Sequence, residues 1–299
     1  MESKKSMSIK NIINIFLPLF FAMLIQIIVV VGDIVAIFIK NMLSDKRTNA
    51  NNTIEYILSK DYTQPMNMAA LSFIQYAMYI LIFGIWYYKT KKPSIKEGFF
   101  SIIKPPVIIP LIIAGMAAQV LVDSILALIR PIFETSFNEY DKLISNVTGA
   151  SASWLMYLSV FLLAPIAEEI LFRGLILSYG KKCMPIYAAV ILQAFLFGLY
   201  HGNIIQGTYA FILGTLLGYI ASKTGTLFAG ICFHIALNTS IAFVPAVLFE
   251  SDFSCIISGA ISFIILIIGI VVMNYMYKKK ADKVNQADYA ISKEDNTED

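Results

Sequence analysis

Apolar runs long enough to approach the thickness of a lipid bilayer recur along the chain, and they restrict its fold more than any other feature. A spanning helix needs about 20 mostly apolar residues. In lipid, only helices and closed barrels satisfy every backbone polar group. We therefore expect an all-α, polytopic membrane bundle of about eight transmembrane helices. The eight runs cover approximately residues 11–39, 67–88, 105–130, 154–177, 185–201, 205–221, 226–249 and 253–277.

Composition and charge agree with a membrane protein. Hydrophobic residues make up 58% of the 299 positions and charged residues only 14%, whereas soluble domains carry about 25% charged residues. Basic residues gather near the N-terminus and at 89–104, 181–182, 223 and 278–280, while acidic residues gather at 131–150 and 250–252. Because Lys and Arg are enriched in cytoplasmic loops, this alternation places both termini in the cytoplasm.

The same pattern divides the chain into five parts. We expect a cytoplasmic N-terminus (1–10), three N-terminal spans with their loops (11–149), a core of four spans (150–249), a last span (250–277) and a disordered charged tail (278–299). Residues 40–66 and 131–150 are expected to be polar loops. The three cysteines, Cys183, Cys232 and Cys255, are scattered without metal or disulfide spacing and are expected to pack as small apolar residues.

Three ionisable side chains, Glu168, Glu169 and Arg173, lie within the apolar run 154–177. Each charge near the centre of a spanning helix costs about 2.5–3.5 kcal/mol, so their presence requires an explanation. Glu169 and Arg173 are four residues apart with the acid first, which favours an ion pair on one helix face. Glu168 is rotated by about 100° and faces elsewhere. The alternatives are a structural pair beside a protonated acid, or a general base in a dry pocket.

The only two histidines, His201 and His234, also lie in predicted spans or at their ends, and each has a partner at helical spacing. Phe197 precedes His201 by one turn, and Asn238 follows His234 by one turn. Polar groups within the membrane need partners, and these side chains are the available partners for one another. Asp123, in an earlier span, is expected to pair with Arg130 or to be protonated.

Two chemistries suit this set of residues. A carboxylate and a histidine can share a water and take its proton, while His234 and Asn238 donate hydrogen bonds to the oxyanion that forms on a peptide carbonyl. Alternatively, Glu168, His201 and His234 could bind zinc with a water in the fourth position. The chain lacks a His-Glu-x-x-His motif, and Asn238 suits an oxyanion hole better than a zinc site, so the metal-free chemistry is slightly favoured.

The ordered motifs Glu-Glu-x-x-x-Arg (168–173), Phe-x-x-x-His (197–201) and His-x-x-x-Asn (234–238) resemble the CAAX-protease and bacteriocin-processing (CPBP, or ABI) family of intramembrane proteases. The type II CAAX prenyl endopeptidase is its eukaryotic member, and the likeness covers about 154–247. The resemblance implies an eight-span endopeptidase open toward the cytoplasm. It assigns water activation to Glu168 and His201, support to Glu169 and Arg173, and oxyanion stabilisation to His234 and Asn238. Members are often labelled metalloproteases, although a metal-free glutamate mechanism has been proposed.

Two other functions remain open at the level of sequence. The first is a non-catalytic bacteriocin-immunity or scaffold protein on the same fold, and the second is a proton-coupled transporter, because such residues also build proton relays. The expected partners are the lipid bilayer and a peptide or membrane-protein substrate, with no nucleic acid. The many Ile, Lys and Asn residues are typical of AT-rich bacterial genomes, so a bacterial plasma membrane is the expected location.

Overall fold

The structure is a computed structural model, and it describes residues 9–43, 65–90, 105–149 and 153–295. Within these ranges the regular elements are helices, with no β-strand. Six helices are long and apolar enough to cross a membrane: Ile9–Ile39, Met68–Thr90, Val107–Ile132, Trp154–Cys183, Ile204–Thr224 and Asp252–Tyr277. Two shorter apolar helices, Ile186–Tyr200 and Leu227–Ser240, correspond to the other two predicted spans. The predicted polytopic helical bundle is confirmed.

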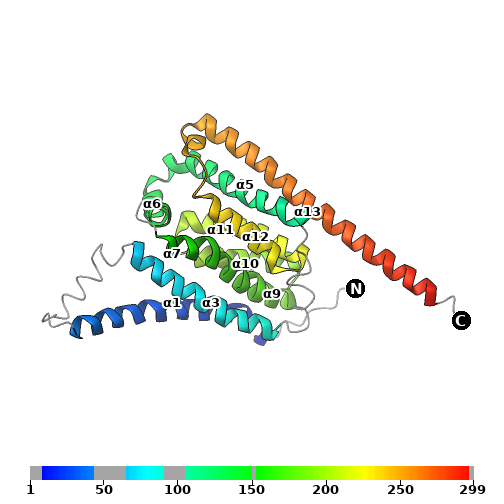
Figure 1. The fold of residues 1–299 in the computed structure, drawn as a ribbon, viewed down its shortest axis with the longest axis horizontal. Helices are drawn as coiled ribbons and strands as arrows, with labels where there is room; N and C mark the ends of the chain where they lie inside the picture. Colours follow the sequence, from blue (N-terminus) through cyan, green and yellow to red (C-terminus); the bar gives the residue numbers. More distant parts are fainter. Residues whose placement is uncertain (1–8, 44–64, 91–104, 150–152, 296–299) are drawn as a thin grey trace. The chain divides into compact units, whose positions relative to one another are not determined.

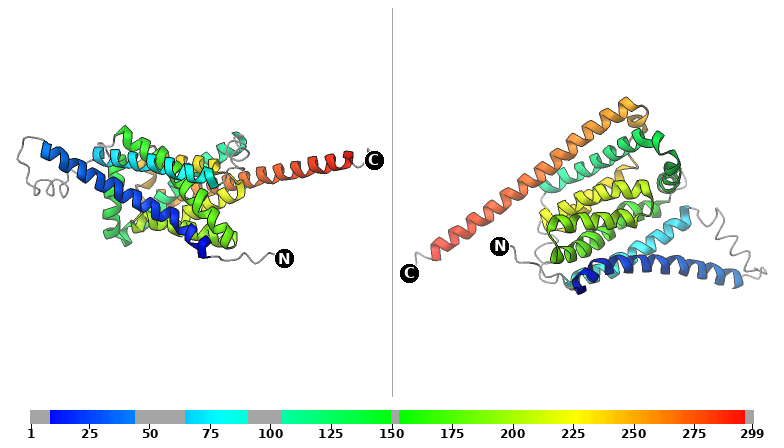
Figure 2. Two further views of the ribbon diagram at one scale, coloured as in Figure 1. Left: turned by 90° about the horizontal axis from the view of Figure 1, so that it is seen from below. Right: turned by 180° about the vertical axis from the view of Figure 1, so that it is seen from behind.

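The chain forms two compact units, of which the first contains residues 1–96 and 129–219. Its helices include α1 (Ile9–Leu43), α3 (Pro65–Thr90), α6 (Glu134–Thr148), α10 (Ile186–Tyr200) and α11 (Ile204–Thr224) as far as Tyr219. Helices α1 and α3 pack side by side (Figures 1 and 2). The tightest part of this packing is aromatic, because Tyr79 and Phe83 of α3 are fully buried.

A continuous helical rod from Trp154 to Cys183 forms the centre of the first unit. It consists of α7 (Trp154–Tyr157), η2 (Leu158–Leu163), α8 (Ala164–Glu168), η3 (Glu169–Ile176) and α9 (Leu177–Cys183). The segments η2 and η3 are π-helical, a wider form with i→i+5 bonds that often occurs at functional sites. Residues 167–177 are all buried, and α3 contacts the rod along α7, η2, α8 and η3.

The second unit contains residues 97–128 and 220–299. It includes α5 (Pro105–Ile129) as far as Leu128, the end of α11, α12 (Leu227–Ser240), η4 (Ala246–Phe249) and α13 (Asp252–Asp295). Small residues let these helices approach closely, as is common in membranes. Gly115 of α5 lies against the Phe233 carbonyl of α12, and Gly269 of α13 lies against Ala114 of α5. The hydroxyls of Ser124 and Ser258 are 3.0 Å apart, which joins α5 to α13 (Figure 1).

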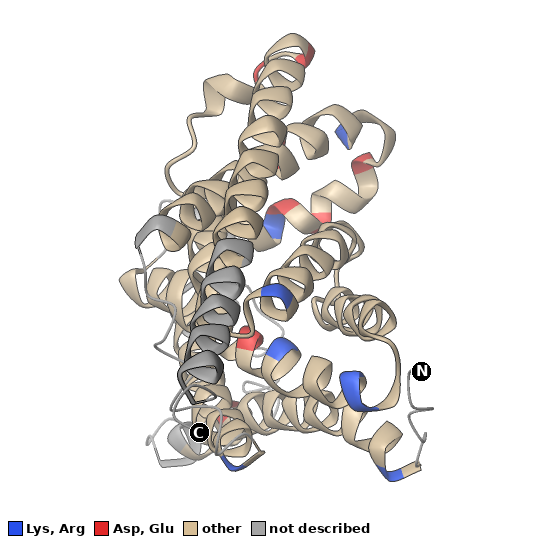
Figure 3. Ribbon diagram, turned by 90° about the vertical axis from the view of Figure 1, so that its right-hand side faces the viewer, with Lys and Arg blue, Asp and Glu red and all other residues tan. Residues whose placement is uncertain are grey.

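The charged side chains are sparse along the described helices, and most of the ribbon in Figure 3 is uncharged. Only a lipid environment suits the many large apolar side chains that remain exposed on α1, α3 and α13. The chain is therefore an integral, multi-pass membrane protein. The predicted basic segment at 91–104, most of the 40–66 loop and residues 1–8 lie outside the described residues.

The structure differs from the predictions in three segments. The expected loop 131–150 contains a short 3₁₀ turn and then α6, whose Phe137 and Tyr140 are buried three residues apart on one face. In the span predicted for 226–249 the α-helix ends at Ser240, whose hydroxyl donates to the Leu237 carbonyl and competes with the backbone, and only the short 3₁₀ helix η4 follows. The tail predicted to be disordered from 278 is helical to Asp295, because no Gly or Pro interrupts it.

Candidate active site

A buried ion pair lies at the centre of the Glu-Glu-x-x-x-Arg motif. The Arg173 Nη1 donates to Glu169 Oε1 at 2.9 Å, and both side chains are 0% exposed. The pairing predicted from the spacing of these two residues is confirmed. The pair lies on η3, facing α11 and α10, so its charges are held inside protein rather than against lipid.

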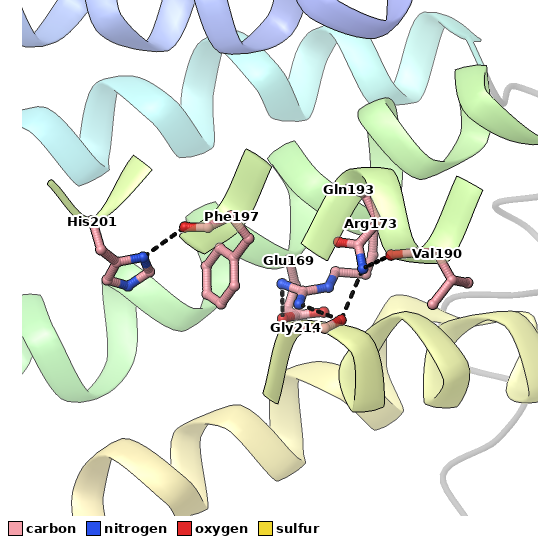
Figure 4. Close-up of polar contacts among 7 residues, drawn as sticks. All are labelled: Glu169, Arg173, Val190, Gln193, Phe197, His201 and Gly214. Atoms are coloured by element: carbon pink, nitrogen blue, oxygen red, sulfur yellow. Dashed lines mark hydrogen bonds and ion pairs between the residues drawn. The ribbon is translucent and has the colours of Figure 1, made fainter. Parts of the chain in front are cut away.

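The guanidinium of Arg173 is held by two further elements (Figure 4). Its Nη2 donates to the Gly214 carbonyl of α11 at 3.1 Å, and its carbon lies 4.6 Å from the centre of the Phe197 ring of α10. The Gln193 amide donates to the same Gly214 carbonyl at 2.8 Å and to the Val190 carbonyl at 3.0 Å. A cation over an aromatic face is attracted by the ring, so α10 and α11 together fix the arginine.

Glycines on α11 make room for these contacts. A Cβ atom on Gly214 would be 3.0 Å from the Phe197 ring, and one on Gly218 would be 2.5 Å from the Gln193 amide nitrogen. Residues 214–218 therefore form a small-xxx-small contact. Without these glycines, α10 could not bring Gln193 and Phe197 so close to Arg173.

His201 follows the last residue of α10 and bonds back to the same helix. Its Nδ1 lies 2.8 Å from the Phe197 carbonyl. A carbonyl only accepts hydrogen bonds, so Nδ1 is the donor, and in the neutral imidazole the lone pair is then on Nε2. The imidazole also contacts the edge of the Phe197 ring, with centroids 4.7 Å apart. Phe197 thus contacts both Arg173 and His201 (Figure 4).

The turn between α10 and α11 fixes the position of His201. Gly202 adopts a left-handed conformation with φ +67°, which costs glycine little. The Asn203 side chain then caps α11, accepting from the backbone N–H groups of Ile205 and Gln206 at 3.0 and 3.1 Å. Helices α10 and α11 diverge little beyond the turn, because Gly198 and Gly207 each lie against the other's carbonyl.

Glu168, the other acid of the motif, is the last residue of α8 and only 5% exposed. Its carboxyl group acts electrostatically on the hydroxyls of Tyr76 and Tyr79 of α3 and Tyr200 of α10. It also acts on Arg173, five residues later, although α-helical spacing predicts a poor placement for that pair. Arg173 lies on the π-helical η3, which begins directly after Glu168 and in which five residues separate hydrogen-bonded groups.

The His-x-x-x-Asn motif lies in the second unit, on α12. His234 is buried at 5% exposure and Asn238 is half-buried one turn later. Thr226 caps this helix by accepting from the Phe228 N–H at 3.2 Å. The structure thus groups Glu168, Glu169, Arg173 and His201 in the first unit and His234 with Asn238 in the second. A common site formed by the two groups stays a prediction.

The residues of the three motifs lie in a segment that matches a known protein family. Residues 150–240 match the family described as type II CAAX prenyl endopeptidase Rce1-like. This segment is Rce1-like. It contains all three motifs, and the family resemblance predicted from them is confirmed. The description of the matching family names a CAAX prenyl endopeptidase. No match was found among curated proteins or among solved structures.

The zinc alternative gains no support from the structure. Among the described residues, no group of three or more His, Cys, Asp or Glu side chains is arranged to hold a metal ion. Of the predicted donors, Glu168 and His201 belong to the first unit and His234 to the second, so zinc binding by these three residues stays a prediction. The label metalloprotease is not supported.

Several polar residues near these motifs are not predicted from the sequence. Gln193 lies inside the Rce1-like segment, whereas Gln75 and Tyr79 belong to α3, outside it. The available signal was weak: Gln75 and Tyr79 are polar residues one helical turn apart within an apolar run, and Tyr200 directly precedes His201. Such a pattern is equally typical of ordinary packing, because Tyr and Gln tolerate half-buried positions.

Proposed function

We propose that the protein is an intramembrane endopeptidase that hydrolyses a peptide bond of a peptide or membrane protein near or within the bilayer. One observation carries the proposal: the buried acid Glu168 directly precedes the buried Glu169–Arg173 ion pair inside the Rce1-like segment. Two acids and an arginine at this depth are costly, and general-base catalysis by Glu168 is a use that justifies the cost.

The proposed mechanism divides the chemistry among four side chains. Glu168 and His201 bind the attacking water, and His201 accepts with Nε2 because its Nδ1 donates to the Phe197 carbonyl. The water attacks the scissile carbonyl. His234 and Asn238 donate hydrogen bonds to the resulting oxyanion. The proton taken from water then passes to the leaving amine. Glu169 and Arg173 keep the first acid and its helix in place.

Two short helices support access of water to this chemistry. Helix α10 has 15 residues and α12 has 14, which correspond to about 22 and 21 Å at 1.5 Å per residue. Both are shorter than the roughly 30 Å hydrocarbon core. Helix ends at membrane depth must be buried in protein or line a water-filled cavity. The end of α10 carries His201, and the end of α12 follows Asn238 by two residues.

We also propose cytoplasmic termini, a site open to the cytoplasm, and a bacterial plasma membrane as the location.

The test uses the full chain in phosphatidylethanolamine–phosphatidylglycerol vesicles with a library of quenched fluorescent peptides, with and without a prenylated cysteine. We expect the wild type to cleave members of the library and Glu168→Ala or His201→Ala to abolish cleavage. His234→Ala and Asn238→Ala should each lower kcat by about 10²–10³. Glu250→Gln, an exposed acid in a turn, is the matched control and should keep full activity.

Two results would overturn the proposal: full activity of Glu168→Ala, or no cleavage of any peptide by the wild type. Solute uptake that collapses with the proton gradient would instead favour a transporter. A separate measurement tests whether turnover depends on zinc. Stoichiometric zinc in the purified protein, together with turnover that a chelator abolishes, would exclude the metal-free mechanism.

A further inference from the structure

A network of hydroxyl and amide groups joins the N-terminal helices to the end of α10. The Tyr79 hydroxyl donates to the Ala22 carbonyl of α1 at 2.7 Å. The Tyr200 hydroxyl of α10 donates to the Tyr79 hydroxyl at 3.2 Å. The Gln75 amide donates to both hydroxyls, at 3.1 Å to Tyr79 and 3.3 Å to Tyr200. Three helices that are distant in sequence therefore meet at one buried point.

The directions of these bonds are consistent with one another. Tyr79 donates one hydrogen bond and accepts two, and Tyr200 donates one and accepts one, which a phenolic hydroxyl can do. The Tyr79 side chain is 0% exposed. A buried hydroxyl that loses its acceptor or donor destabilises the folded state, because its hydrogen bond is left unmade. Removing one side chain of the network therefore destabilises the positions of the others.

The network holds the residue next to the proposed base. Tyr200 is the last residue of α10, and His201 follows it at the C-terminal end. Helix ends fray more readily than helix centres unless they are tied down. The Tyr200 ring lies edge-to-face with His201, at 6.0 Å between centroids, and with Phe172 of η3, at 5.6 Å. Fixing Tyr200 therefore fixes both the backbone and one side of the imidazole.

We propose that Gln75 and Tyr79 are positioning residues for His201, so that α3 forms part of the active site although it lies outside the Rce1-like segment. This inference rests on the proposed protease function for its catalytic consequence. The acid Glu168 acts electrostatically on Tyr79 and Tyr200, so the same network borders both members of the proposed water-activating pair. Without it, the last turn of α10 moves and Nε2 loses its alignment with the water.

The first experiment needs no substrate. The chain has only two histidines, so ¹⁵N-labelled histidine in the full protein gives two sets of imidazole signals, assigned with His234→Gln. In the wild type we expect the His201 ring to show the tautomer protonated at Nδ1. In Tyr79→Phe and Gln75→Leu, the His201 signals should shift or broaden while those of His234 stay unchanged. Tyr88→Phe, on the same helix but 52% exposed, should change neither.

The second experiment measures the rate at which the protein cleaves those quenched fluorescent peptides that the wild type accepts, referred to below as reporter peptides. Tyr79→Phe and Tyr200→Phe should each lower kcat by about tenfold with KM within about twofold, because each removes a hydroxyl of the positioning network together with its hydrogen bonds. The double variant should be no slower than either single variant, since both remove the same tie. Tyr88→Phe should turn over at the wild-type rate.

The outcomes separate this inference from the proposed function. Unchanged His201 signals and full kcat in Tyr79→Phe, with Glu168→Ala inactive, would overturn the positioning role alone. An inactive wild type would overturn the protease, while the imidazole signals would still decide whether the network holds His201. If Tyr79→Phe and Gln75→Leu both fail to fold while Tyr88→Phe folds, the network has only a structural role and the proposal is wrong.

Discussion

Two arginine–carboxylate pairs in the first unit share their chemistry and differ in their surroundings. Arg130 binds Asp141 through two hydrogen bonds of 2.7 and 2.9 Å, and Arg173 binds Glu169 through one of 2.9 Å. Each guanidinium lies over a phenylalanine ring, at 4.7 Å for Phe137 and 4.6 Å for Phe197. The side chains of the first pair are 48% and 47% exposed, whereas those of the second are 0% exposed.

The comparison shows that burial, more than hydrogen-bond geometry, determines how strongly the loss of such a pair affects stability. An exposed ion pair contributes about 0–1 kcal/mol even with good geometry, because water and salt screen it. Removing one partner of a buried pair costs about 3–5 kcal/mol, because the other charge is left without compensation. A buried pair is also expensive to form. Its presence in the Rce1-like segment is best explained by a task that an apolar pair could not perform.

The largest expected effect comes from Arg173→Met. This change leaves Glu169 buried without its cation and should lower the free energy of unfolding by about 3–5 kcal/mol and abolish peptide cleavage. Arg130→Met is the matched control and should cost no more than about 1 kcal/mol. Thermal unfolding in a nonionic detergent measures both, and cleavage of the reporter peptides measures activity.

A double variant sharpens this result. Glu169→Gln combined with Arg173→Met removes the stranded charge and should recover part of the lost stability without recovering activity. Equal destabilisation by Arg173→Met and Arg130→Met would mean that burial does not distinguish the two pairs. In that case the environment-based account would be wrong.

The sequence predicts the buried pair and not the exposed one, for physical reasons. Glu169 and Arg173 are local in sequence, and four-residue spacing is enough to bring them together. Asp123 was expected to pair with Arg130 or to be protonated. Arg130 instead binds Asp141 on α6, while Asp123 accepts from Gln119 at 2.9 Å. The sequence of 131–150 lacks a long apolar run, so a helix there was not predicted.

Contacts between distant helices were likewise beyond prediction. The eight apolar runs are strong local signals, and each of them corresponds to a helix. The meeting of Tyr79 with Tyr200 depends on how α3 packs beside the rod and α10. Spacing along one helix cannot report such packing. The motif residues could therefore be named from sequence, whereas the residues that hold them in place could not.

An intermediate effect is expected from Gly218→Ala, which disturbs the buried pair without touching its charges. The new Cβ would lie 2.5 Å from the Gln193 amide nitrogen, so the amide must leave the Gly214 and Val190 carbonyls. Losing two such hydrogen bonds should cost about 1–3 kcal/mol. Gly84→Ala, where a Cβ meets nothing within 4 Å, should be neutral or slightly stabilising.

A second substitution tests the cause assigned to Gly218→Ala. In a Gln193→Ala background the obstructing amide is gone, so Gly218→Ala should cost little more. If Gly218→Ala lowers the free energy of unfolding by the same amount in that background, its effect arises elsewhere in the contact between α10 and α11. Either way, no comparable effect is expected at the exposed pair, whose partners lie on η1 and α6.

The smallest effect concerns the exposed pair and depends on pH. Hydrogen bonds from Arg130 lower the pKa of Asp141 below its ordinary value of 3.8. A carboxyl group whose pKa is lower in the folded state stabilises the fold above the unfolded pKa and loses that contribution as pH falls through the folded pKa. The gap in unfolding free energy between the wild type and Asp141→Asn should be at most about 1 kcal/mol at pH 7. It should narrow as pH falls below the ordinary pKa, close once pH falls through the lowered pKa of the folded state, and shrink in 1 M salt, where the Debye length is about 3 Å. A gap that persists at low pH and high salt would show that this pair, like Glu169–Arg173, is shielded from water.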